Sequence, residues 1–219
     1  MIIAIDGPAA SGKSTTAKKV AEKLSCLHID TGAMYRAVTL YFLKNKISLN
    51  HPTKVKIFLD RIKIILTDNG GIYLNGIEVT EEIRSEEINR RVSDVSAIFH
   101  VREKLVEIQR KIAQNGDIVM EGRDIGTRVF PDADLKFYLS ADVKERAQRR
   151  LKEMIEKGEE KKLEDVISEL SERDQIDSSR KYSPLKKAND AILIDTTDLT
   201  IEEQVSEIVA NINQKIKPR

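Results

Sequence analysis

The stretch Gly7-Pro8-Ala9-Ala10-Ser11-Gly12-Lys13-Ser14 decides the fold, because it matches the pattern G-x-x-x-x-G-K-[ST] in full. An apolar run of strand length precedes it at 2–6. After it, apolar residues recur over 17–24 at spacings of i, i+3, i+4 and i+7, which predicts one buried face of a helix. Strand, glycine loop and helix form the context that this motif requires. We therefore predict a phosphate-binding loop (P-loop) at the start of the chain.

The residue types in this loop suit a nucleoside triphosphate. Gly7 and Gly12 let the backbone curl so that its N–H groups point inward, and these groups and the following helix N-terminus hold phosphate oxygens. Lys13 can reach the β- and γ-phosphates, and the Ser14 hydroxyl can ligate Mg²⁺. We expect ATP and Mg²⁺ as the cofactors.

The composition excludes several other classes of protein. The chain has 219 residues and a formal net charge of +1, which argues against a general nucleic-acid or membrane-surface binder. A single cysteine, Cys26, excludes an intramolecular disulfide. No apolar run reaches the roughly 18 residues of a membrane span. The chain enters a core strand at once, leaving no room for a signal peptide. We expect a cytoplasmic protein. We also expect a monomer, because no long exposed apolar face stands out.

Five apolar runs of strand length alternate with helical patterns. They lie at 2–6, 27–30, 117–121, 135–139 and 191–195. This alternation predicts an α/β fold with a five-stranded parallel sheet that is covered by helices on both faces. Right-handed crossovers place the carboxyl ends of all strands on one edge, so the loops that follow them converge.

The pattern of apolar residues changes between residues 61 and 79. Alternating apolar residues there surround a turn at Asp68–Gly71 and the hairpin signal Asn75-Gly76. We predict a small antiparallel β lobe inserted at about 61–98. Asp68–Gly71 spells the GTPase-like string D-x-x-G, which we interpret as coincidence because it lies in a hairpin.

Two charged helices follow the fourth core strand. Arg146, Arg149 and Arg150 share a face of the first, and Arg173, Asp177 and Arg180 share a face of the second. Guanidinium groups above a P-loop can neutralise charge on a transferring phosphoryl group. We predict a helical lid at about 146–182 on a core formed by about 1–60, 99–145 and 185–219, all within one domain.

Charged residues also end the inner strands. Arg36 lies in the first turns of the helix after the second strand, where it could hold an anion. Glu121 ends the third strand and runs into the turn 122–126, and it could steady Mg²⁺ through water. Charges at the carboxyl end of a central strand are costly unless they serve a ligand. The layout predicts a phosphoryl-transfer enzyme that works by positioning and charge neutralisation.

The chain resembles the bacterial cytidylate kinases, within the nucleoside monophosphate kinase family, over almost its whole length. The motifs that carry the resemblance are I-D-G-P-A-A-S-G-K-S-T at Ile5–Thr15, D-T-G-A-M-Y-R at Asp30–Arg36, E-G-R-D-I-G-T at Glu121–Thr127, F-P-D-A at Phe130–Ala133, E-R-A-Q-R-R at Glu145–Arg150, E-R-D-Q-I-D-S-S-R at Glu172–Arg180 and D-A-I-L-I-D-T-T at Asp190–Thr197. The inserted β lobe is also typical of this family.

This resemblance implies transfer of the ATP γ-phosphoryl group to CMP or dCMP, with roles for named residues. The loop Gly7–Thr15 and Arg149 would bind ATP, with Lys13, Arg123, Arg146, Arg150 and Arg180 as catalytic residues. Ser93, Arg102 and Asp124 would read the cytosine edge, and Arg36, Arg123 and Arg180 would clamp the acceptor phosphate. Arg173 and Asp177 would contact the sugar hydroxyls. Thr31 stands where some relatives have serine, and Glu121 where some have aspartate, so the reach of Glu121 to the metal stays open.

Two alternatives remain at this point. A kinase for another nucleoside monophosphate or a small metabolite would keep the fold but not the cytosine-reading set. A P-loop switch that hydrolyses GTP would need a guanine-reading N-K-x-D string, which this sequence lacks.

Overall fold

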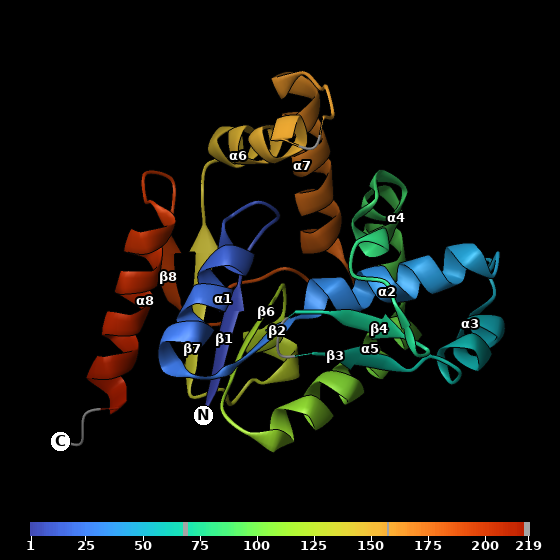
Figure 1. Cartoon of the computed structure of the whole chain (residues 1–219), viewed down its shortest axis with the longest axis horizontal. Coiled ribbons are helices and arrows are strands. Elements are labelled where there is room, and N and C mark those ends of the chain that lie inside the picture. The colour runs from blue at the N-terminus through green and yellow to red at the C-terminus, as the bar shows by residue number, and fades with distance from the viewer. Residues whose placement is uncertain (68–69, 157, 217–219) are drawn as a thin grey trace.

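The computed structural model of the chain describes residues 1–67, 70–156 and 158–216. Its centre is a five-stranded parallel sheet in the order β2-β6-β1-β7-β8 (Figure 1). The strands are β1 (Ile2–Asp6), β2 (Leu27–Asp30), β6 (Ile118–Gly122), β7 (Leu135–Ser140) and β8 (Ile192–Asp195). The predicted parallel sheet is therefore confirmed, and β1 lies in its middle.

Helices cover both faces of this sheet, as the alternation of apolar runs predicts. On one face, α1 (Lys13–Leu24) and α8 (Ile201–Ile216) pack on β1 and β7 through a shared apolar cluster that includes Val20, Phe137 and Ile208. On the other face, α5 (Phe99–Ile112) and the single turn η3 (Ile125–Val129) pack on β1 and β6. A short turn η2 (Ala113–Asn115) follows α5.

The predicted antiparallel lobe is present as the sheet β3-β4-β5. Its strands are β3 (Ile64–Leu66), β4 (Ile72–Leu74) and β5 (Ile77–Glu78), and they are followed by η1 (Glu82–Arg84) and α4 (Glu86–Ser96). Asn75 and Gly76 both have positive φ, at 51° and 85°, as a tight hairpin turn requires. Of the turn predicted at Asp68–Gly71, residues Asp68 and Asn69 lie outside the described residues.

The lobe packs on α2 (Thr31–Lys44) through the apolar cluster that also includes α3 (Pro52–Leu59). Helix α3 was not among the predicted elements. Its signals are Pro52 in the first turn and the buried pair Val55 and Leu59, spaced i, i+4. The lobe therefore joins the molecule through α2, whose N-terminus lies at the edge of the central sheet.

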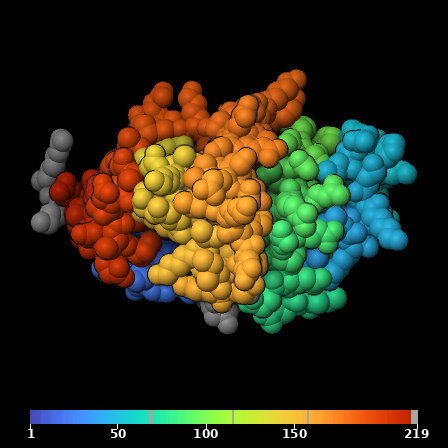
Figure 2. Space-filling view, turned by 90° about the horizontal axis from the view of Figure 1, so that it is seen from above, coloured from blue at the N-terminus to red at the C-terminus, as the bar shows by residue number. Residues whose placement is uncertain are grey.

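The lid consists of α6 (Val143–Glu156) and α7 (Leu163–Ser179). The lid has a small apolar core, which also contains Ala9 of the P-loop. Its lid residues are Ala147, Met154, Val166 and Leu170. Seen from above, the lid occupies the middle of the molecule, between α8 and the lobe (Figure 2). Within the described residues, no helix is long and apolar enough to cross a membrane.

Candidate functional site

The P-loop leaves β1 and ends at the N-terminus of α1. A Cβ at Gly7 would collide with the backbone carbonyl oxygen of Leu139 on β7, so only glycine fits there. Gly12 has φ +85°, in the left-handed region that favours glycine. Lys13 Nζ donates to the carbonyl of Pro8 at 3.1 Å. Burial and the nearby Arg123 lower the pKa of Lys13 to about 7, against the opposing charge of Glu121.

Ser14 and Glu121 meet beside the loop. Ser14 Oγ donates to Glu121 Oε2 at 2.6 Å, and His28 Nε2 lies 3.2 Å from Glu121 Oε1. Thr31 Oγ1 donates to the Glu121 carbonyl at 2.7 Å. A hydroxyl and a carboxylate are hard oxygen ligands, which suits Mg²⁺ held by few protein groups together with phosphates. The geometry therefore fits the predicted metal position.

Arg102 and Asp124 form a buried ion pair, with Arg102 Nη2 2.6 Å from Asp124 Oδ2 and each side chain 4 % exposed. Arg102 Nη1 donates to the carbonyl of Ser96 at 3.0 Å, and its guanidinium lies 5.1 Å from the centroid of the Tyr35 ring. Ser93 is buried one turn before Ser96 on α4. An acceptor and a donor thus lie side by side, buried and packed against an aromatic ring.

Arginines gather between this pocket and the P-loop. Burial, followed by the charges of Arg123 and Arg36, lowers the pKa of Arg173 to about 9. The pKa of Arg36 is also lowered, first by burial, while Asp30 opposes the shift and the charges of Arg123 and others add to it. Like charges held together out of water are unfavourable unless an anion joins them. The cluster is therefore an electrostatic environment that favours an anion.

Asp177 of α7 balances part of this charge. Arg123 Nε donates to Asp177 Oδ2 at 3.0 Å, and Arg180 Nη1 lies 3.5 Å from Asp177 Oδ1. Arg180 Nη1 also donates to Ser96 Oγ at 3.2 Å. The Asp177 carboxylate therefore joins the turn after β6 to the lid helix, and Arg180 extends this network to α4.

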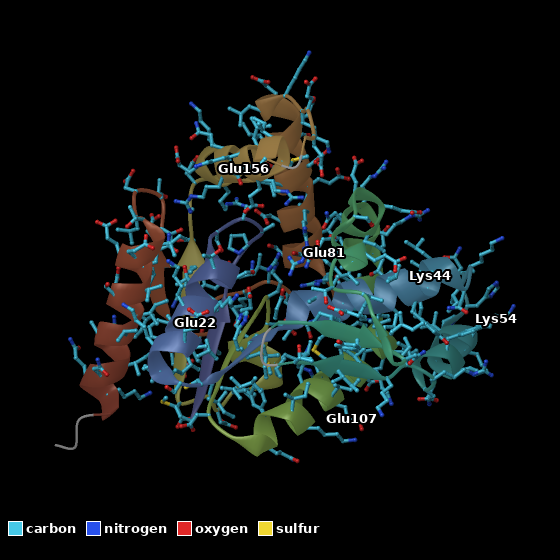
Figure 3. All side chains as sticks on the ribbon, in the orientation of Figure 1. Glu22, Lys44, Lys54, Glu81, Glu107 and Glu156 are labelled. Atoms are coloured by element: carbon cyan, nitrogen blue, oxygen red, sulfur yellow. The ribbon has the colours of Figure 1, made fainter. Side chains whose placement is uncertain are left out.

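Several buried donors in this cluster have no hydrogen-bond partner among the described residues. They are Arg102 Nε, Arg173 Nε and Arg180 Nη2. Buried donors without partners are rare in folded proteins because each costs free energy. The charged residues labelled in Figure 3, such as Lys44, Lys54, Glu107 and Glu156, lie instead at the periphery of the molecule.

The three predicted lid arginines have different surroundings. Arg146 is 6 % exposed, and it donates to the P-loop carbonyl of Ala9 at 3.1 Å and pairs with Asp174 at 2.6 Å. Arg149 donates to the carbonyls of Thr196 and Thr197, in the loop after β8. Arg150 pairs with Glu153 at 3.1 Å, and its charge contributes to lowering the pKa of Arg36. The three arginines therefore contact three different parts of the molecule.

Sequence reasoning missed several residues of this site. Tyr35 and Ser96 complete the pocket around Arg102, and Asp6 holds the backbone after Asp124. Tyr35 stands directly before Arg36, so its place in the motif was a signal. Asp6 is the last residue of β1, and the sequence pattern of that strand indicates only an apolar run.

Taken together, a P-loop on a parallel sheet, a buried arginine cluster and a helical lid define a nucleotide-binding phosphotransferase. The family model described as cytidylate kinase matches residues 3–214. The chain belongs to the cytidylate kinase family.

Curated relatives support the same assignment. A cytidylate kinase from Clostridioides difficile is 51 % identical over 213 residues, which cover 97 % of this chain and 98 % of that protein. A cytidylate kinase from Bacillus subtilis is 48 % identical over 97 % of this chain and 96 % of its own length. A solved structure of a putative kinase from Chloroflexus aurantiacus aligns with a TM-score of 0.50, 14 % identity and coverage of 99 % of this chain and 98 % of that one, which shows similarity of fold.

Proposed function

We propose that the chain transfers the γ-phosphoryl group of ATP to CMP or dCMP, giving ADP and CDP or dCDP. Membership of the cytidylate kinase family supports this reaction. The observation that carries it in the structure is the buried pair of Arg102 and Asp124, which lies next to a cluster of arginines with unpartnered donors.

The cytosine edge matches the chemistry of this pair. Its exocyclic amine needs an acceptor, which Asp124 supplies, and its ring nitrogen and carbonyl oxygen need donors, which Arg102 supplies. Ser93 is close on α4, and the ring of Tyr35 lies under the Arg102 guanidinium. Uracil carries a carbonyl in place of the amine and would face the carboxylate with a second acceptor.

In this scheme the acceptor and donor phosphates would be bound by two different sets of residues. On the acceptor side, Arg36, Arg123 and Arg180 would clamp the CMP phosphate, and Arg173 and Asp177 would hold the sugar. On the donor side, the loop Gly7–Thr15 with Lys13 would cradle the ATP phosphates. Arg149 of α6, which donates to the carbonyls of Thr196 and Thr197, would lie beside the nucleotide. Arg146 and Arg150 would add positive charge from the lid.

Mg²⁺ would be held by Ser14 directly and by Glu121 through water, and it would neutralise charge on the ATP phosphates. The protein provides no covalent nucleophile in this scheme. Its residues position two anions in line and offset the charge that gathers between them.

We also propose the unit boundaries of the sequence prediction: a lobe at about 61–98, which contributes Ser93 to the acceptor pocket, and a lid at about 146–182. We propose a monomer that acts in the cytoplasm. The lobe, the lid and the core each contribute residues to one site, so the chain supplies both nucleotide sites by itself.

The deciding experiment measures ADP release from Mg·ATP with CMP, dCMP, UMP, AMP and dTMP as separate acceptors. Turnover with CMP and dCMP that exceeds the others by an order of magnitude or more is the expected result. Equal turnover with UMP would contradict the role of Asp124. Absence of turnover with every acceptor, with tight GTP binding, would support a P-loop switch instead.

A further inference from the structure

Asp6 is a buried carboxylate that the proposed reaction does not use. It ends β1, directly before the P-loop, and is 4 % exposed. Its Oδ1 accepts the backbone N–H of Ile125 at 2.8 Å, and its Oδ2 accepts the backbone N–H of Gly126 at 2.8 Å. Both carboxylate oxygens are therefore directed at two successive N–H groups that lie 119 and 120 residues further along the chain.

These N–H groups belong to the first turn of η3, which follows the base-reading residue Asp124. The first N–H groups of a helical turn have no partner within the turn, and an aspartate at the preceding position commonly accepts one of them. Asp124 occupies that preceding position, yet its side chain makes no such capping bond. Its carboxylate pairs with Arg102 instead.

Asp6 thus performs the capping that Asp124 does not. Burying a carboxylate is costly, and burial raises the pKa of Asp6 to about 7 although the two N–H groups and Arg123 oppose the increase. An apolar residue at this inward-facing strand end would avoid that cost. The two hydrogen bonds to the turn therefore explain why a carboxylate is buried at this position.

We propose that Asp6 is a positioning residue for acceptor recognition: it caps η3 in place of Asp124, so that the Asp124 carboxylate stays free to face Arg102 and the base. Asp6 also immediately precedes Gly7, so a single residue joins the backbone of the P-loop to the turn that carries Arg123 and Asp124. This inference rests on the proposed function, since it names which part of the site Asp6 serves.

The test is the variant Asp6→Asn. An amide keeps one acceptor oxygen but presents an NH₂ group to the other N–H, so one of the two bonds is lost. Because misplacement of a binding group by about 1 Å can reduce a rate by about 100-fold, we expect the KM for CMP to rise at least tenfold. The KM for ATP should change by less than about threefold, because the P-loop keeps its own glycines and contacts. The preference for CMP over UMP should fall in parallel.

Asp134→Asn is the matched control. Asp134 Oδ2 accepts the backbone N–H of Ile2 at 2.7 Å, so it is also a carboxylate bonded to a backbone N–H of the β1 region, but at the opposite end of that strand. Its replacement should leave both KM values and the CMP preference unchanged.

Gly126→Ala supplies a second variant if Asp6→Asn does not fold. A Cβ at Gly126 would lie 3.1 Å from Lys136 Cδ and 3.4 Å from Asp6 Oδ2, so the turn or the Lys136 side chain would have to shift by a few tenths of an ångström next to the carboxylate. The expected change is smaller and in the same direction.

Three outcomes separate the possibilities. An unmodified chain that does not phosphorylate CMP would overturn the proposed function itself. If it does so, but a folded Asp6→Asn variant keeps its KM for CMP and its CMP preference, the positioning role is wrong. Equal increases in the KM for CMP and for ATP would also overturn it, because they would show a general structural role.

Discussion

Arg123 Nε and Asp177 Oδ2 lie 3.0 Å apart and connect the turn after β6 to the lid helix α7. Asp177 is almost fully buried and also faces Arg180. The positions of the lid and of the acceptor-binding turn are therefore linked by a single carboxylate. The same carboxylate is the one that we propose for the sugar of the acceptor, so we expect acceptor binding and lid position to be coupled.

Asp177→Asn should weaken this link. The amide keeps the shape but removes the charge between two guanidinium groups, and loss of one partner of a buried ion pair lowers the free energy of unfolding by about 3 kcal/mol. We expect this loss in denaturant titrations, together with a rise in the KM for CMP that exceeds the rise for dCMP. Asp165→Asn, at an exposed position of the same helix, is the control. An equal effect on CMP and dCMP would argue against a contact to the 2′-hydroxyl.

Arg180→Ala should reduce turnover without unfolding the chain. Arg180 has an unpartnered buried Nη2, which we assign to the acceptor phosphate. Arginines that stabilise a transferring phosphoryl group contribute about 10³-fold or more to rates. Steady-state kinetics with CMP should show a loss of this order, while the neighbouring variant Lys181→Ala should be unchanged. Wild-type turnover in Arg180→Ala would remove Arg180 from the phosphate clamp.

Asp124→Asn should relax the choice of base. An amide can donate to the carbonyl of uracil as well as accept from the amine of cytosine, so the ratio of kcat/KM for CMP over UMP should fall by about tenfold or more. The exposed Asp132→Asn in the following loop serves as the control. The measurement is a pair of acceptor titrations at saturating ATP, and an unchanged ratio would place base selection on other residues.

Glu121→Gln should raise the requirement for Mg²⁺. The substitution removes the charge that we propose to orient the metal through water, and loss of such an outer contact commonly weakens metal affinity by about 10-fold to 100-fold. The check is the concentration of Mg²⁺ that gives half-maximal rate, accompanied by Mn²⁺ binding followed by electron paramagnetic resonance. Glu22→Gln on α1 is the control (Figure 3). Unaltered Mn²⁺ binding would contradict a role of Glu121 at the metal.

The stability of the ligand-free chain should depend on Asp6 between about pH 4 and pH 7. The pKa of Asp6 is raised from 3.8 to about 7 in the folded chain, so within this window the folded state binds more protons than the unfolded state. The free energy of unfolding contributed by Asp6 therefore falls as the pH rises, by at most about 4 kcal/mol across the window. Denaturant titrations from pH 5 to pH 8 should show a steeper fall for the unmodified chain than for Asp6→Asn. Parallel profiles would show that the pKa of Asp6 is not raised.

Much of the fold was predictable from local patterns. Each predicted feature spans only a few residues, where sterics and periodicity determine the local conformation. These features are the P-loop motif, the five apolar runs and the Asn75-Gly76 turn. Helix α3 was missed because it is short, with one buried pair at helical spacing, a pattern too brief to stand out.

The site was predictable in its residue types but not in its connections. Charged residues at strand ends and on the lid helices marked Glu121, Arg123 and Asp177, because charge in such places needs a ligand. The lid arginines show the limit of this reasoning, since Arg146, Arg149 and Arg150 are close in sequence yet contact Ala9, Thr196 and Glu153 respectively.

The sequence alone determined which segments form strands and helices and where the phosphate-binding loop lies, because these depend on interactions between near neighbours in the chain. Only the tertiary structure decided the strand order, which sets β1 between β6 and β7, and the contacts of Asp6 with Ile125 and Gly126. Those contacts join groups more than a hundred residues apart. Their hydrogen bonds and buried charges depend on packing that no local pattern of residues encodes.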